Sequence, residues 1–105
     1  MASGVLGQSA PSAGVATTVY TVPASTLSVV TISCVNRGTS AATVRIALAS
    51  TATPTNQEYI EYGAVVPSAG VLERNGVALE AGKRVNVFSS TADTSFNVYG
   101  LEQTV

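Results

Sequence analysis

The sequence predicts an all-β fold, a single antiparallel β-sandwich of about seven or eight short strands, on three observations. Val and Thr, which stiffen at χ1 and fit pleated strands, dominate the chain together with Ser and Ala. No stretch repeats apolar and charged residues at helical spacing over three turns. Gly and Pro turn signals recur about every ten residues, which is typical of a jelly-roll-like sandwich.

The N-terminal segment differs from the remainder of the chain. Residues 1–16 are rich in Ser, Ala and Gly and carry no charged side chain, so we expect them to form an arm or an edge strand. The β-sandwich domain is expected over residues 17–105. Its first strand is predicted at Thr17–Val22, because Pro23 cannot donate a ladder hydrogen bond and therefore ends it.

The next two predicted strands show the clearest alternation of side chains. The second strand, Leu27–Asn36, presents three apolar residues on one face: Val30, Ile32 and Cys34. A turn at Gly38 leads to the third strand, Ala42–Ala49. Three apolar residues of this strand are expected to point inward while Arg45 projects outward: Val44, Ile46 and Leu48.

Turn residues divide the second half of the chain. Thr51–Gln57 contains a proline and is predicted to be a loop. In Pro67–Gly70 the proline presets φ and the glycine is expected to supply a positive φ. Asn75-Gly76 predicts a two-residue type I′ hairpin, and Glu80–Lys83 predicts another turn. The strands expected between these turns are Glu58–Tyr62 continuing through Ala64–Val66, then Val71–Arg74, Arg84–Ser89 and Ser95–Leu101.

Charged residues are scarce. They make up 10% of the 105 residues, against roughly 25% in an ordinary soluble domain. A Ser/Thr-rich solvated surface is one interpretation, and a surface covered by neighbouring subunits is the other. The net charge of −1 gives no basic excess for nucleic acid, and no apolar run is long enough to span a membrane. Because Met1–Val15 lacks signal-peptide features, we expect the chain to be made in the cytoplasm.

The residues that catalysis most often needs are missing or scattered. The sequence has no histidine and one cysteine, Cys34, which lies in an apolar run and is expected to be a buried, inert thiol. Glu58 and Glu61 are three residues apart, so a strand would place them on opposite faces, and both are interpreted as structural charges. We therefore expect no catalytic residue, no metal site and no cofactor.

Arginine and tyrosine supply the candidate interface residues, because both types are enriched at protein interfaces. Phe88 and Phe96 are interpreted as core residues. The tyrosines fit either amphipathic packing with the hydroxyl in water or a sugar-stacking platform. The interface candidates are Arg37, Arg45, Arg74, Tyr59 and Tyr62.

An ordered set of short stretches resembles small virion structural proteins of tailed bacteriophages, notably those that infect cyanobacteria and other aquatic bacteria. No single motif is diagnostic, and the order of the set carries the resemblance over most of the chain. The stretches are Leu6-Gly7-Gln8-Ser9-Ala10, Val19-Tyr20-Thr21-Val22-Pro23-Ala24, Val35-Asn36-Arg37-Gly38, Val44-Arg45-Ile46-Ala47, Tyr59-Ile60-Glu61-Tyr62, Leu79-Glu80-Ala81-Gly82 and Phe96-Asn97-Val98-Tyr99-Gly100. The resemblance implies a β-sandwich that decorates or joins parts of a particle.

The expected function is therefore that of a non-enzymatic virion protein, located in the particle. The first hypothesis is a capsid decoration or cement protein, a homo-oligomer with a trimer favoured, that binds the major capsid protein or other virion proteins. A tail, baseplate or fibre component is the second hypothesis. A carbohydrate-binding module for host attachment is the third. Neither nucleic acid nor a membrane is expected as a partner.

Overall fold

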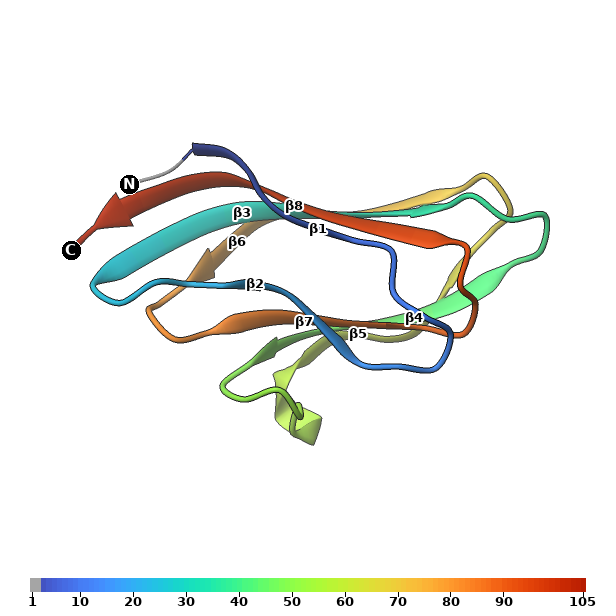
Figure 1. Ribbon diagram of the computed structural model, residues 1–105, viewed down its shortest axis with the longest axis horizontal. Helices are drawn as coiled ribbons and strands as arrows, with labels where there is room; N and C mark the ends of the chain where they lie inside the picture. The colour runs from blue at the N-terminus through green and yellow to red at the C-terminus, as the bar shows by residue number, and fades with distance from the viewer. Residues whose placement is uncertain (1–2) are drawn as a thin grey trace.

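Eight strands and one short 3-10 helix make up the computed structural model, which describes residues 3–105 (Figure 1). The predicted all-β class is confirmed. Several predicted segments are longer in the structure, because their strands continue through residues that look like turns or ends. The strands are β1 (Ser3–Ser9), β2 (Thr17–Thr21), β3 (Thr26–Asn36), β4 (Ala42–Ala49), β5 (Tyr59–Val66), β6 (Val71–Leu79), β7 (Arg84–Ser89) and β8 (Thr94–Thr104), and the 3-10 helix is η1 (Asn56–Glu58).

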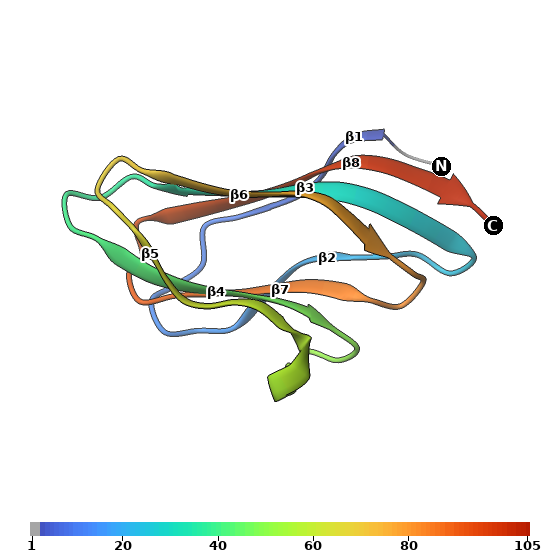
Figure 2. The ribbon, with the colours of Figure 1, turned by 180° about the vertical axis from the view of Figure 1, so that it is seen from behind.

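The strands form two antiparallel sheets that lie face to face (Figures 1 and 2). Sheet A has the order β1-β8-β3-β6, and sheet B has the order β2-β7-β4-β5. The chain changes sheet at every connection between strands except the one from β4 to β5. This strand order is that of a jelly roll, in which two antiparallel sheets pack against each other. The predicted architecture is therefore confirmed.

The core forms along the centre of each sheet. In sheet A, β3 pairs with β8 without interruption, from Thr26 opposite Thr104 to Asn36 opposite Thr94. Alternation then directs one set of side chains of these strands between the sheets, where they are fully or almost fully buried. That set is Val30, Ile32, Cys34, Phe96 and Val98. The predicted inward face of the second strand is therefore confirmed, and so is the burial of the thiol.

Sheet B supplies the opposite half of the core. Val44 and Ile46 of β4 are fully buried, whereas Leu48 is half-buried and packs at the margin of the core. Arg45 projects to the outer face, as alternation requires. From β7, Val85 and Val87 complete this layer.

Every edge pairing contains an irregularity, and no central pairing does. Register shifts interrupt the pairings of β1 with β8, β2 with β7, β5 with β4 and β6 with β3. The two central pairings, β3 with β8 and β4 with β7, run without a shift. Because bulges twist an edge away from a would-be partner strand, all four edges are poor templates for adding a strand.

The N-terminal segment forms one of these edges. Within the predicted arm or edge strand of residues 1–16, Ser3–Ser9 is β1 at the edge of sheet A, and residues 1–2 lie outside the described residues. The chain then crosses to sheet B, where the N–H of Gly14 donates to the carbonyl of Ser89 at 2.8 Å.

The predicted hairpin at Asn75-Gly76 is wrong. Strand β6 continues through both residues, which together stand opposite Thr31 of β3 and form a bulge. Gly76 has a φ of 66°, so the left-handed conformation that Asn-Gly favours is present but serves a bulge instead of a turn. A bulge forms and not a hairpin, because β6 pairs with β3 on both sides of Asn75-Gly76.

The turn predicted at Pro67–Gly70 is present, with the N–H of Gly70 donating to the carbonyl of Pro67 at 2.8 Å. The residue with positive φ is Ala69, at 59°, and not the expected glycine. Proline occupies the first position of the turn, which places Ala69 at the third position, where a type II turn needs a left-handed residue. Gly70 is favoured for lack of space and not for its φ, because an added Cβ would lie 2.9 Å from the carbonyl oxygen of Pro67.

Replacement of Gly100 by alanine should destabilise the fold strongly. Gly100 has a φ of 153°, and a Cβ there would lie 2.2 Å from the carbonyl oxygen of Val29 in the central ladder. We expect Gly100→Ala to lower the free energy of unfolding by about 3 kcal/mol or more, measured by urea denaturation.

Gly63→Ala is the matched control, because Gly63 also has a positive φ, of 72°, but no atom lies within 4 Å of an added Cβ. Its expected cost is about 1–2 kcal/mol, the cost of the left-handed conformation alone. Equal losses for the two variants would show that the close approach of β8 to β3 at Gly100 does not matter.

Candidate interaction surfaces

Three of the five predicted interface residues lie together on the outer face of sheet B. Arg45 of β4 stands opposite Tyr62 of β5 and opposite Phe88 of β7 in the strand register. The Arg45 guanidinium lies 4.5 Å from the centroid of the Tyr62 ring and 4.4 Å from that of the Phe88 ring. Tyr59 packs edge-on against Tyr62, with ring centroids 5.0 Å apart. We call Arg45, Tyr59, Tyr62 and Phe88 the arginine–aromatic cluster.

Phe88 was expected in the core, and that prediction is wrong. Val85 and Val87 of the same strand are buried between the sheets, so alternation turns Phe88 to the outer face, where it is half-buried. The alternation within Arg84–Ser89 was the signal that could have placed it. Phe96, in contrast, is fully buried, as expected.

The other two predicted interface residues hold parts of the chain together. The guanidinium of Arg37 donates to the Ser95 hydroxyl at 2.8 Å and to the Ala92 carbonyl at 3.2 Å, fixing the loop before β8. Arg74 of β6 forms a salt bridge with Glu61 of β5, which links the two sheets at one edge of the sandwich. Neither residue is part of the arginine–aromatic cluster.

The outer face of sheet A carries a second surface, which the sequence did not single out. The alternation that buries one set of side chains of β3 and β8 exposes the other set, including Val29 at 47% and Leu101 at 64%. These two residues are cross-strand partners, and Val5 stands opposite Tyr99 beside them. We call this surface the apolar face; its residues are Val5, Leu27, Val29, Tyr99 and Leu101.

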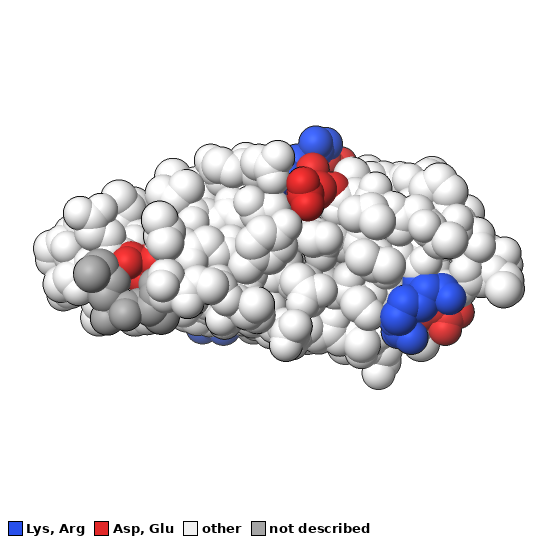
Figure 3. Space-filling model, turned by 90° about the horizontal axis from the view of Figure 1, so that it is seen from above, with Lys and Arg blue, Asp and Glu red and all other residues white. Residues whose placement is uncertain are grey.

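Charge is nearly missing from the apolar face. Figure 3 views the molecule from the side of sheet A and shows broad uncharged areas between a few small groups of charged atoms. Glu73 of β6 borders the apolar face, and the Tyr99 hydroxyl donates to its carboxylate at 3.1 Å. This hydrogen bond raises the pKa of Tyr99 above its usual value. A neighbouring protein that covered this surface would therefore desolvate few ionic groups, which keeps the free-energy cost of covering it low.

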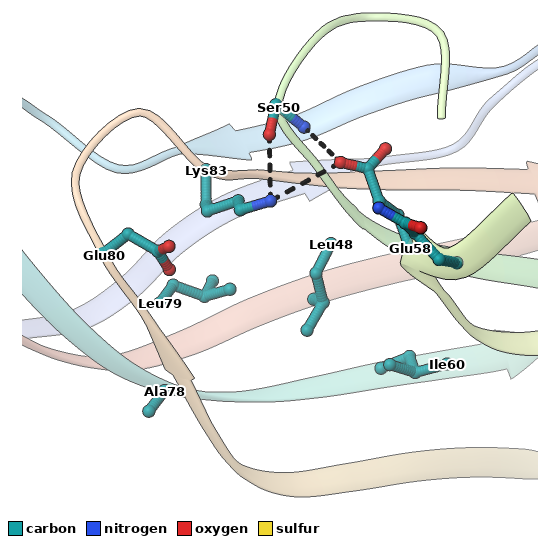
Figure 4. A pocket seen from close by; sticks show the side chains of 9 residues that line it. Leu48, Ser50, Glu58, Ile60, Ala78, Leu79, Glu80 and Lys83 are labelled. Atoms are coloured by element: carbon teal, nitrogen blue, oxygen red, sulfur yellow. Dashed lines mark hydrogen bonds and ion pairs between the residues drawn. The ribbon is translucent and has the colours of Figure 1, made fainter. Parts of the chain in front are cut away.

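A shallow cleft of about 430 Å³ opens between β4, β5 and β6 (Figure 4). Apolar side chains such as Leu48 and Ile60 line one part of it, and Lys83, Ser50 and Glu58 line another. Glu58 accepts hydrogen bonds from the backbone N–H of Thr55 at 2.9 Å and of Ser50 at 3.0 Å, and Lys83 lies 3.5 Å away. These donors, led by the Thr55 N–H, lower the pKa of Glu58 to about 2.

Three polar residues of the cleft, Glu58, Lys83 and Ser50, are thus already paired with one another. Glu58 holds the loop before η1 onto the end of β4, and the Lys83 ammonium donates to the Ser50 hydroxyl at 2.9 Å. The prediction that Glu58 and Glu61 are structural charges agrees with these contacts and with the bond of Glu61 to Arg74. Across residues 3–105, no group of three or more His, Cys, Asp or Glu side chains is placed to hold a metal ion.

A polar network around Tyr20 joins the two sheets near one end of the core. The hydroxyl of Tyr20, on β2, donates to Glu102 of β8 at 2.5 Å and lies 2.6 Å from the hydroxyl of Ser28 on β3. Burial, with help from the bond to Glu102, raises the pKa of Tyr20 to about 12. Burial likewise raises the pKa of the Cys34 thiol to about 11, so the nucleophilic thiolate is scarce near neutral pH. Neither Tyr20 nor Cys34 lines either of the two clefts found among residues 3–105.

Comparison with known proteins identifies no relative: no protein-family model, no curated protein and no solved structure matches this chain. None of the helices among the described residues has the length and apolar character needed to cross a bilayer.

Acidification should test the role of Glu58. Because its pKa in the folded chain lies below the ordinary value, Glu58 stabilises the protein fully above about pH 5, and that stabilisation is lost as the pH falls through about 4.5 towards about 2. Glu58→Gln should therefore lower the melting temperature at pH 7 and reduce its decline between pH 5 and pH 2. Glu80→Gln, which changes another carboxylate at the same cleft, is the control. Parallel melting curves for wild type and Glu58→Gln over this pH range would contradict the assignment.

Proposed function

We propose that this chain is a non-enzymatic structural subunit of a tailed-bacteriophage particle, and that it decorates the capsid by binding neighbouring protein subunits through the apolar face. The single observation that carries the proposal is the exposure of apolar side chains across the centre of sheet A. Soluble monomers seldom expose a large contiguous apolar surface, and such surfaces mark sites of association.

The expected gain per subunit is modest. Each residue of the apolar face is between 36% and 64% exposed, so covering it is worth about 1 kcal/mol per side chain. Summed over the five side chains this gain is about 5 kcal/mol, near the low end of the roughly 4–15 kcal/mol that association costs in lost freedom of motion, so little net affinity remains for a single subunit. A particle overcomes this deficit by presenting many linked sites, which raises avidity without new contacts. Decoration of a repetitive shell suits such a surface better than a solitary one-to-one complex.

The strand pairing is the reason for placing the capsid contact on a face of the sandwich and not on a strand edge. Jelly-roll edges offer unpaired backbone groups to a partner strand, but each edge pairing here is interrupted by a register shift. The central ladder of sheet A is regular, so its outer surface is an even pleated layer suited to packing against another layer. The expected assembly is a homo-oligomer, with a trimer favoured, seated on the major capsid protein.

The fold and the sequence resemblance both support the proposed virion role. Jelly rolls recur in viral capsid proteins and in lectins, which is support by analogy and not by site chemistry. The scarcity of charge, at 10% of residues, fits a protein whose surface is partly covered in use.

The location in the particle tests the decoration role. Heads and tails of the phage that encodes this chain are separated, and each fraction is analysed by quantitative mass spectrometry. The proposal predicts the chain in the head fraction, at a copy number comparable to that of capsid subunits. Recovery in tails alone would replace decoration with a tail role, and absence from both fractions would overturn a virion function.

Charge introduced into the apolar face should abolish binding without unfolding the chain. Val29 and Leu101 are exposed, so Val29→Lys and Leu101→Lys leave the core intact while forcing two ammonium groups into the contact. We expect the double variant to bind undecorated shells at least about tenfold more weakly in co-sedimentation. Val65→Lys is the matched control, because Val65 is also 64% exposed but lies on β5 in sheet B. Wild-type binding by the double variant would contradict the proposed contact.

A further inference from the structure

Arg45 is a cation held in place without an anion. Three of the other basic residues have polar partners: Arg37 bonds the loop before β8, Arg74 pairs with Glu61, and Lys83 pairs with Glu58. Among residues 3–105, no hydrogen-bond acceptor or carboxylate contacts the Arg45 guanidinium, whose neighbours are the two aromatic rings. None of its nitrogens is a buried, unpaired atom, so they face solvent.

The rings fix the orientation of this cation. Phe88 and Tyr62 lie at 4.4 Å and 4.5 Å from the Arg45 guanidinium, and their electron-rich faces attract it. A guanidinium restrained in this way loses little side-chain entropy when its N–H groups bind an anion, and its planar fork matches a carboxylate. The site is therefore preorganised for an anionic group that the chain itself does not supply.

Two phenol groups stand beside the cation. Tyr62 is 66% exposed, and Tyr59 packs against it edge-on. Neither hydroxyl has a hydrogen-bond partner among the described residues. The cluster thus offers a ring on which a flat ligand can stack and hydroxyl groups that can bond other hydroxyls.

We propose that the arginine–aromatic cluster binds an acidic saccharide, a sugar unit that carries a carboxylate. The carboxylate accepts hydrogen bonds from Arg45, the sugar ring lies against the exposed Tyr62 ring, and the phenol hydroxyls bond sugar hydroxyls. A sugar unit fits the extent of the cluster, which consists of one arginine and three rings. An acidic protein segment would pair with the Arg45 guanidinium but would leave the exposed Tyr62 ring without a flat partner.

The location of the cluster allows it to act together with the apolar face. It lies on the outer face of sheet B, on the side of the sandwich opposite to the apolar face of sheet A. A chain docked through sheet A would therefore present the cluster outward. The two clefts found among residues 3–105 are lined by other residues, so the cluster is expected to bind a single ligand weakly, and repeated copies would supply avidity.

The experiment is a two-dimensional ¹H–¹⁵N NMR titration of the isolated chain with glucuronic acid, and with glucose as the neutral analogue, at pH 7. We expect glucuronic acid to shift the amide signals of the β4, β5 and β7 segments around Arg45, Tyr62 and Phe88. Glucose should bind at least about tenfold more weakly, because it lacks the charge that the guanidinium recognises. Equal binding of both sugars, or shifts that lie elsewhere, would overturn the proposal.

Variants identify the anchoring residue. Arg45→Gln should weaken glucuronic acid binding by about tenfold or more, and Arg45→Lys should recover only part of the loss, because lysine keeps the charge without the planar fork. Arg37→Gln removes the same charge from a residue outside the cluster and should leave binding unchanged. An unaltered affinity in Arg45→Gln would contradict the assignment.

A peptide of six glutamates serves as the competing ligand. It offers carboxylates without a sugar ring, so the proposal predicts weaker binding, per carboxylate, than glucuronic acid shows. Tighter binding of the peptide to the same residues would overturn the saccharide assignment in favour of an acidic protein segment. Loss of glucuronic acid binding would leave the proposed capsid contact untouched, because that contact depends on sheet A.

Discussion

The uninterrupted ladder between β3 and β8 is the constraint on which most of this structure depends. It fixes the register of the two longest strands, so alternation assigns every side chain of both strands to the core or to the outside. Inward it places Ile32, Cys34 and Phe96, and outward it places Val29 and Leu101. Since both sets are apolar, the same ladder that builds the core also creates a surface that water does not favour.

Several of the few charged side chains connect segments that are distant in the sequence. Arg74 and Glu61 connect the edges of the two sheets, and Lys83 and Glu58 hold the loop before η1 near β4. Because these few ionic groups connect separate segments, the outer face of sheet A is left nearly uncharged. On sheet B, Arg45 lies against two aromatic rings and not against an anion. The two faces of the sandwich therefore differ in chemistry, which suits a protein that contacts one partner on each side.

Much of the fold could be predicted from local pattern, and much of the surface could not. Strands β4 and β7 have the predicted bounds, because clear alternation between turn signals leaves little choice. The bulge at Asn75-Gly76 escaped prediction, since the same dipeptide suits a hairpin and only pairing with β3 excludes one. The cluster of Arg45 with Tyr62 and Phe88 depends on the register of three strands, which sequence alone does not reveal. The scarcity of charge left two interpretations open, a solvated Ser/Thr-rich surface and a covered one, and it did not indicate which face a partner would cover.

Hydroxyl-radical footprinting of the phage particle in which we place this chain tests most directly whether the apolar face is covered. Oxidation of individual side chains is compared by mass spectrometry between the isolated chain and the intact particle. The account predicts strong protection of Val5, Val29, Tyr99 and Leu101 in the particle, while Tyr62 and Val65 of sheet B stay as reactive as in the free chain. Unchanged reactivity of the sheet A residues on assembly, or protection confined to sheet B, would contradict it.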